Sequence, residues 1–249
     1  MDHTCYAYSS AKYVWPLYIE DPTRESTTEK KLGESGCSVF AGQENALLPY
    51  YGVSLSGDVK SYVEVVMSSD NVFVDFSVGV EFYPLSIEGG TVLHYLHDTS
   101  LGGDVVTGGL AEFVTAFNST HAFMEAFDAS GSRIGYEEKK FVVLVNAWDR
   151  FSLAYDASKP EFKLISDLEK EILKFNLLAD KDTSIALPGR LRVGAPIGDS
   201  PYPGLHGGIV CLTMHDVSMG HGDVTKVLES ECASLNLSGG VANGNPFSS

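Results

Sequence analysis

A strict two-residue alternation between Val72 and Phe82 is the feature that most limits how this chain can fold. Every second residue is apolar, in the order Val72, Val74, Phe76, Val78, Val80 and Phe82. Asp75, Ser77, Gly79 and Glu81 lie between them. Side chains of a β-strand point alternately to opposite faces, so the pattern predicts a strand with one buried and one solvated face. Pro84 is expected to end that strand.

Shorter apolar runs recur along the chain, with turn-forming residues between them about every ten residues. Strands are expected over residues 61–65, 91–96, 113–117, 122–127, 141–145, 151–155, 162–165, 191–193 and 209–214. Many short strands with regular turn signals predict an all-β sandwich or jelly roll.

Helical spacing of apolar residues is confined to two segments. We interpret residues 166–178 as a loop with some helix, and residues 223–232 as a candidate helix. No internal repeat is present, so one domain is expected over residues 1–233. Residues 234–249 are rich in Ser, Gly and Asn and are expected to form a flexible tail.

The chain of 249 residues carries a formal net charge of −16. Such an acidic surface repels phosphate backbones and anionic lipids, which argues against nucleic-acid and membrane-surface partners. The acidity serves solubility, or it attracts cations such as calcium. No apolar run approaches the roughly 20 residues of a membrane span, so membrane insertion is not expected.

No apolar signal segment follows Met1, so the chain is either cytosolic or an excised module. Two N-glycosylation sequons begin at Asn118 and Asn236 and favour a secreted, extracellular origin.

The four cysteines are Cys5, Cys37, Cys211 and Cys232, and none forms a CxxC pair. They are either free buried thiols or disulfides that tie the two ends of the chain together. Of the three pairings, Cys5–Cys232 with Cys37–Cys211 is placed first.

Several segments resemble the strands of the laminin-G-like, concanavalin-type superfamily, in the order of that family. The matching segments are Trp15 to Leu17, Gly57 to Val65, Val78 to Pro84, Ala147 to Asp156, Leu191 to Gly194 and Gly207 to Asp216. The last is similar to the family's closing strand, with His215 where a tyrosine is usual. The region from Glu161 to Leu187 lacks the family's clear hairpin. The resemblance implies a concanavalin-like jelly roll of two antiparallel sheets, with the first and last strands side by side.

The resemblance also implies a structural calcium site, because lectin-like relatives bind this ion near their joined termini. Asp216 matches the aspartate of the family's closing strand, and Asp58 lies in a turn where it could assist. The alternative is that Asp216 bonds turn amides at the end of a strand.

Catalytic patterns are weak. Glycoside hydrolysis needs two carboxylates flanking the bond, and the nearest candidates are Glu81 with Glu88 and Glu125 with Asp128. His94 and His97 are three residues apart and therefore point to opposite faces of a strand. A transition-metal site formed by His215, His221 and Asp223 is less favoured than a polar loop. No catalytic residue is assigned, and the chain is not expected to be an enzyme.

Aromatic residues offer a different kind of site. A sugar platform could use Tyr50, Tyr51, Tyr83, Tyr95 and Trp148, although most aromatic side chains of sandwiches lie in the core. The leading hypothesis is a non-catalytic recognition or adhesion module that binds glycan or protein through loops at one end of the sandwich. The alternatives are a self-associating subunit of an extracellular matrix, fibre or coat, and then a glycan-cleaving enzyme.

Overall fold

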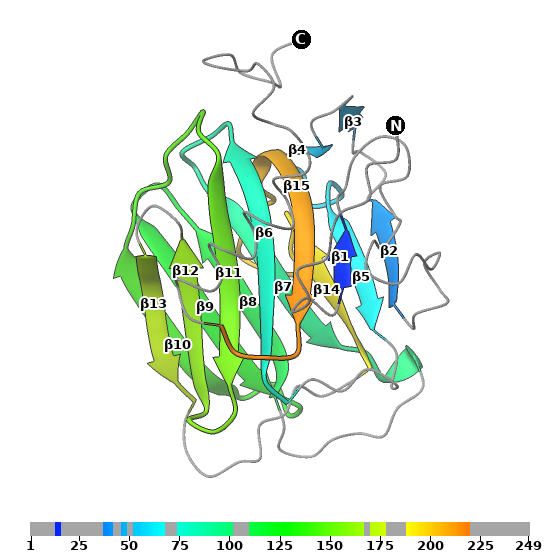
Figure 1. The fold of residues 1–249 in the computed structure, drawn as a ribbon, viewed down its shortest axis with the longest axis vertical. Helices are drawn as coiled ribbons and strands as arrows, with labels where there is room; N and C mark the ends of the chain where they lie inside the picture. Colours follow the sequence, from blue (N-terminus) through cyan, green and yellow to red (C-terminus); the bar gives the residue numbers. More distant parts are fainter. Residues whose placement is uncertain are drawn as a thin grey trace.

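Two antiparallel β-sheets packed face to face make up the part of the protein that the structure describes (Figure 1). The computed structural model describes residues 13–15, 37–41, 46–48, 52–67, 74–101, 110–166, 170–177 and 188–219. Within these ranges the helical content is one short 3₁₀ turn, Thr99–Leu101, and no helix is long and apolar enough to cross a membrane. The predicted all-β jelly-roll sandwich is therefore confirmed.

The first sheet has eight strands and contains both ends of the described chain. Its order is β13 (Lys170–Asn176), β12 (Glu161–Ser166), β11 (Asp149–Asp156), β6 (Phe76–Pro84), β15 (His206–His215), β4 (Gly52–Ser56) and β3 (Ala46–Leu48). The eighth strand, β1 (Tyr13–Trp15), pairs antiparallel with β15, with Tyr13 opposite Met214. The first and last strands thus lie side by side, as the resemblance implies.

The second sheet has seven strands. Its order is β10 (Arg133–Lys140), β9 (His121–Asp128), β8 (Leu110–Phe117), β7 (Gly90–His97), β14 (Gly189–Val193), β5 (Val63–Met67) and β2 (Cys37–Ala41). Its tight turns use side-chain acceptors. The amides of Thr120 and His121 donate to Oδ1 of Asn118 at 2.8 Å each, which closes the β8–β9 hairpin. Asp128 accepts from Ser130 and Ser132 in the same way after β9.

Phenyl rings from both sheets meet in the core. Phe151 of β11 packs against Phe82 at 4.6 Å between ring centroids and against Phe117 of the other sheet at 5.0 Å. Phe113 of β8 lies 5.6 Å from Phe162 of β12. All five rings are buried, and edge-to-face and tilted pairs add to the free energy gained by burying their area.

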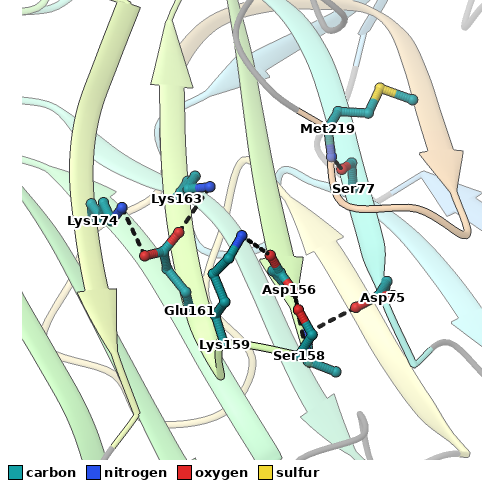
Figure 2. A network of polar contacts seen from close by, with 10 residues as sticks. Asp75, Ser77, Asp156, Ser158, Lys159, Glu161, Lys163, Lys174 and Met219 are labelled. Carbon is teal, nitrogen blue, oxygen red and sulfur yellow. Dashed lines mark hydrogen bonds and ion pairs between the residues drawn. The ribbon is translucent and has the colours of Figure 1, made fainter.

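The alternating segment forms β6, but the expectation of a solvated face is wrong. The strand begins at Phe76 and includes Pro84, and all nine of its residues are buried. One cause is the chain after β15, which turns back over this face (Figures 1 and 2). There the Ser77 hydroxyl donates to the Val217 carbonyl at 2.8 Å and accepts from the Met219 amide at 2.9 Å. A polar residue on a central strand can thus be buried when its hydrogen bonds are satisfied.

The strand expected over residues 141–145 is absent. Phe141 and Val143 are buried, whereas Val142 and Leu144 are more than half exposed, but the segment joins no ladder. It connects the sheets instead, with the Phe141 amide bonded to Thr120 and the Asn146 amide bonded to Pro84. The strand before it, β10, was not predicted, because its charged outer residues lack the apolar alternation of a half-buried strand.

The interpretation of residues 166–178 as loop with some helix is also wrong, because β13 occupies residues 170–176. Leu164 pairs with Leu173 and the next residue, Ile165, pairs with Glu171, so Ile172 is an extra residue in a bulge. The bulge leaves both Ile172 and Leu173 buried, and this is why the apolar spacing resembles that of a helix. β12 and β13 thus form an antiparallel hairpin in a region where the sequence showed no clear one.

An ion-pair cluster holds this hairpin on its outer face. Glu161 lies between Lys163 and Lys174, with Nζ–Oε distances of 2.8 Å to each (Figure 2). Burial of Glu161 opposes its ionisation, but the two lysine hydrogen bonds outweigh burial and hold the pKa of Glu161 below its ordinary value.

Several sequence predictions fall on residues outside the described ranges. These are Cys5, Cys232, Asn236, the candidate helix 223–232 and the tail 234–249. The backbone of Cys37 lies in β2 of the seven-stranded sheet, and that of Cys211 lies at a register shift in β15 of the other sheet. Their side chains are outside the description, so the disulfide pairings stay predictions.

The packing between the edge strands β10 and β13 can be tested at Gly135. A Cβ atom at this position of β10 would lie 2.1 Å from the ring of Phe175 on β13. We expect Gly135→Ala to lower the free energy of unfolding by about 1–3 kcal/mol in urea titrations, because the ring must move. In a Phe175→Leu background the same change is expected to cost clearly less, since the two positions are coupled. Equal costs in both backgrounds would contradict this packing.

Candidate functional site

The two aspartates considered for calcium lie at opposite ends of one strand. Asp58 follows Ser56, which pairs with His206 at the start of β15, whereas Asp216 follows His215 at its end. A strand of ten residues spans roughly 30 Å, so one ion cannot use both carboxylates. Oδ1 of Asp58 already accepts the Lys60 amide at 2.8 Å.

The described residues do not assemble a carboxylate site for a metal. Within the ranges given above, no three His, Cys, Asp or Glu side chains come together as a metal-binding group would require. Calcium also takes backbone carbonyl oxygens as ligands, so this finding does not test calcium at Asp216. Calcium at Asp216 stays a prediction and enters no step below.

The candidate carboxylate pairs are not arranged around a common space. Glu81 is buried on β6 beside Arg150, whereas Glu88 is exposed in the turn before β7. Glu125 and Asp128 lie on opposite faces of β9, and Asp128 is occupied by its turn.

The histidines are held in structural contacts where the chain is described. His94 is buried, and its Nε2 lies 3.0 Å from Oε1 of Glu112. The Ile197 amide donates to Nδ1 of His94 at 3.0 Å, which fixes the loop between β14 and β15 onto the seven-stranded sheet. His215 is buried at the end of β15, and its proposed companions His221 and Asp223 lie outside the described ranges.

The aromatic platform considered from the sequence is only partly accessible. Tyr95 is a core residue, and Tyr83 is buried against Trp148 with ring centroids 5.3 Å apart. Trp148 itself is partly exposed. Tyr50 and Tyr51 lie outside the described residues.

A different aromatic group lies on the outer face of β9 and β10. Ala122, Met124 and Ala126 of β9 point into the core, so the residues between them point outward. Phe123 and Glu125 are therefore partly exposed, and Tyr136 of β10 is 41% exposed. We call this group the β9–β10 surface; it consists of Phe123, Glu125, Arg133, Tyr136, Glu138 and Tyr202.

Tyr202 reaches this surface from the loop between β14 and β15. Its ring centroid lies 5.8 Å from that of Phe123, with a tilt of 38°. Backbone hydrogen bonds fix both sides of the loop, from the Thr91 amide to Pro203 and from the Leu205 amide to Gly194. Two aromatic rings from distant parts of the sequence are thus held together at a partly exposed position.

Charged groups surround these rings. The Tyr136 hydroxyl donates to Oε2 of Glu138 at 2.7 Å. Arg133 donates to Oε1 of Glu125 at 3.1 Å, and its guanidinium lies 5.0 Å from the centre of the Tyr136 ring. Arginine over an aromatic face is a favourable cation–π contact that orders both side chains.

The pKa values of both phenols are raised, each for a different main reason. The hydrogen bond to Glu138 is the main reason that the pKa of Tyr136 is raised to about 12. The pKa of Tyr202 is also raised to about 12, mainly by desolvation and further by the negative charge of Glu125. The two phenols therefore stay neutral to a higher pH than an ordinary tyrosine does.

Sequence reasoning missed this surface, although a signal for it was present. In the segment His121 to Asp128 the even positions are Ala, Met, Ala and Asp, and the odd positions are His, Phe, Glu and Phe. The small and flexible residues point inward and the rings outward, which is the reverse of the usual expectation that aromatic residues fill the core. Only the pairing of β9 with its neighbours shows which face is outer.

Comparisons with known proteins agree on the fold. No protein-family model matches the chain, and no curated protein does. The ligand binding domain of botulinum neurotoxin serotype D, solved in complex with N-acetylneuraminic acid, is similar with a TM-score of 0.58 and 11% identity over 92% of this chain and 53% of that chain. The receptor binding domain of botulinum neurotoxin type G is similar with a TM-score of 0.53 and 9% identity, over 88% and 50% of the two chains. The chain spans about half the length of these domains, and the likeness shows a shared fold.

The effect of the Glu138 carboxylate on the pKa of Tyr136 can be measured directly. We expect Glu138→Gln to lower the pKa of Tyr136 from about 12 toward the ordinary phenol value, because the phenolate is no longer repelled by a carboxylate. NMR titration of ring-labelled tyrosine gives the pKa, and Tyr136→Phe assigns the signal. Glu137→Gln is the matched control, since Glu137 points to the other face of β10. An unchanged pKa in Glu138→Gln would disprove the contact.

Proposed function

We propose that this protein is a non-catalytic glycan-binding module and that the β9–β10 surface binds the glycan. The observation that carries the proposal is the placement of Phe123 and Tyr202, two partly exposed rings 5.8 Å apart, next to the carboxylates of Glu125 and Glu138. The fold is also that of a domain solved with a bound sugar, which supports the class of function by analogy.

The chemistry of the surface suits a sugar. One face of a pyranose ring is lined by C–H groups that pack on an aromatic ring, while its hydroxyls need hydrogen-bond partners. Phe123 and Tyr136 supply exposed ring area, and Glu125 and Glu138 supply acceptors for hydroxyls. The anchoring of the Tyr202 loop and the ion pair of Arg133 hold these groups in place before a ligand arrives, which reduces the entropy lost on binding.

The hydrogen bonding of the two carboxylates supports a binding role over glycoside cleavage. Glu125 accepts from Arg133, and Glu138 accepts from the Tyr136 hydroxyl. A general acid must instead carry a proton and donate it to the leaving oxygen. Both groups thus act as hydrogen-bond acceptors, which is the role in which a carboxylate holds a sugar hydroxyl.

An extracellular location is part of the proposal. Asn118 begins its sequon at the exposed tip of the β8–β9 hairpin, and its Oδ1 accepts from the Thr120 and His121 amides. These bonds use only the oxygen, so the Nδ2 group to which a glycan would be attached is not consumed by the turn.

The binding proposal is tested by substituting one ring at a time. We expect Phe123→Ala to weaken binding to oligosaccharides from a glycan array by at least about tenfold in calorimetry, as loss of a stacking ring commonly does. Trp148→Ala is the matched control, because Trp148 is a partly exposed aromatic residue just before β11 of the other sheet. Loss of binding in Trp148→Ala but not in Phe123→Ala would instead place the glycan site at Trp148 and Tyr83. A flat array response together with self-association in size-exclusion chromatography would favour a structural subunit.

Secretion is tested through the sequon. Expression through a eukaryotic secretory pathway is expected to add a glycan at Asn118, seen as a mass increment that peptide N-glycosidase removes. Asn118→Gln and Thr120→Ala are expected to lack that increment, whereas Ser119→Ala keeps the sequon and should retain it. A secreted protein with unmodified Asn118 would contradict this part of the proposal.

A further inference from the structure

The charges of the β9–β10 surface select among glycans. We infer that it takes a neutral, hydroxyl-rich glycan and discriminates against sugars that carry a carboxylate, such as N-acetylneuraminic acid. This inference rests on the proposed function and adds the chemical class of the ligand.

The balance of charge on the surface is negative. Glu125 and Glu138 face outward beside a single guanidinium, that of Arg133. Arg133 is already bonded to Glu125 at 3.1 Å and lies over the Tyr136 ring. An anionic ligand that reached the remaining N–H groups of Arg133 would therefore lie close to the Glu125 carboxylate, and the two negative charges would repel each other.

One neutral donor of the surface is committed as well. The Tyr136 hydroxyl donates to Glu138. The two carboxylates offer a ligand acceptor lone pairs. Sugar hydroxyls can donate to such acceptors, whereas a sugar carboxylate has no proton to donate at neutral pH and repels them.

Two further basic groups, His121 and Lys140, lie at the other end of the β9–β10 pair from Arg133. His121 lies with Nδ1 2.8 Å from the Thr120 hydroxyl and 3.8 Å from Oε1 of Glu138. Lys140 is an exposed cation opposite His121, two residues beyond Glu138 and at the end of β10. The whole chain adds a net charge of −16, which opposes the approach of any anion at low ionic strength.

The inference separates this protein from its structural neighbour. The serotype D toxin domain was solved with N-acetylneuraminic acid, a sugar that carries a carboxylate. At 11% identity the two proteins share a sandwich and not a set of side chains, so the ligand of one does not transfer to the other.

The test uses matched pairs of oligosaccharides that differ in one terminal residue. The full chain is titrated calorimetrically with neutral oligosaccharides that it binds on an array, and with the same compounds capped by N-acetylneuraminic acid. We expect the capped compounds to bind at least about tenfold more weakly, with a smaller difference at high salt.

Variants assign the discrimination to this surface. The double variant Glu125→Gln/Glu138→Gln removes two charges with little change of shape and is expected to reduce the difference between capped and neutral compounds to about threefold or less. The control Glu88→Gln/Asp216→Asn removes two exposed charges elsewhere, so it changes the net charge equally and should keep the full difference. Glu138→Gln alone serves if the double variant does not fold.

The possible outcomes distinguish failure of the charge-based inference from failure of the glycan-binding proposal. Equal or tighter binding of the capped compounds by the unaltered protein overturns the inference and leaves the glycan-binding proposal standing. A discrimination that disappears equally in the control variant also overturns it, because net charge would then be the cause. Absence of binding to either member of every pair overturns the proposed function, and the inference with it.

Discussion

The packing of aromatic rings between the two sheets is the constraint on which the rest of the structure depends. Phe151 contacts Phe82 beside it and Phe117 across the sandwich, and Phe113 contacts Phe162 in the same way. These contacts fix which face of each strand is inner. Because side chains alternate, a slip of β9 by one residue would bury Phe123 and expose Met124. The candidate site is therefore a consequence of the core.

Strands with a strong apolar pattern could be predicted from the sequence, and strands at the open edge could not. β6, β7, β11 and β12 carry regular alternation, and the structure places them close to the expected ranges. β10 and β13 are edge strands whose apolar residues are few or shifted by a bulge. The apolar pattern of a sequence indicates which residues of a strand are buried, but it does not indicate which strands pair. β10 and β13 are held by pairing with their neighbours and by the close approach of Gly135 to Phe175.

The candidate site depended even more on long-range contacts. Glu125 was noticed in the sequence, but as one half of a carboxylate pair with Asp128, which lies on the other face of the strand. Its actual neighbours are Arg133 from the next strand and Tyr202 from a loop more than seventy residues away. No spacing rule brings these residues together. The sequence of β9 does contain an unusual alternation, in which the aromatic residues alternate with Ala122, Met124 and Ala126 and so lie on the other face of the strand.

The fold alone does not determine the ligand, which depends on the hydrogen-bonding groups that the outer face leaves available. A sandwich supplies a rigid sheet, and side chains on its strands are placed more reproducibly than those on loops. On this protein the only guanidinium of the β9–β10 surface is bonded to a carboxylate, and the Tyr136 hydroxyl donates to a carboxylate too. Such a surface accepts hydrogen bonds far better than it donates them. Under the proposed glycan-binding role, the same sheet with an unpaired arginine would favour an anionic sugar, so we infer that the charge arrangement and not the fold decides the ligand.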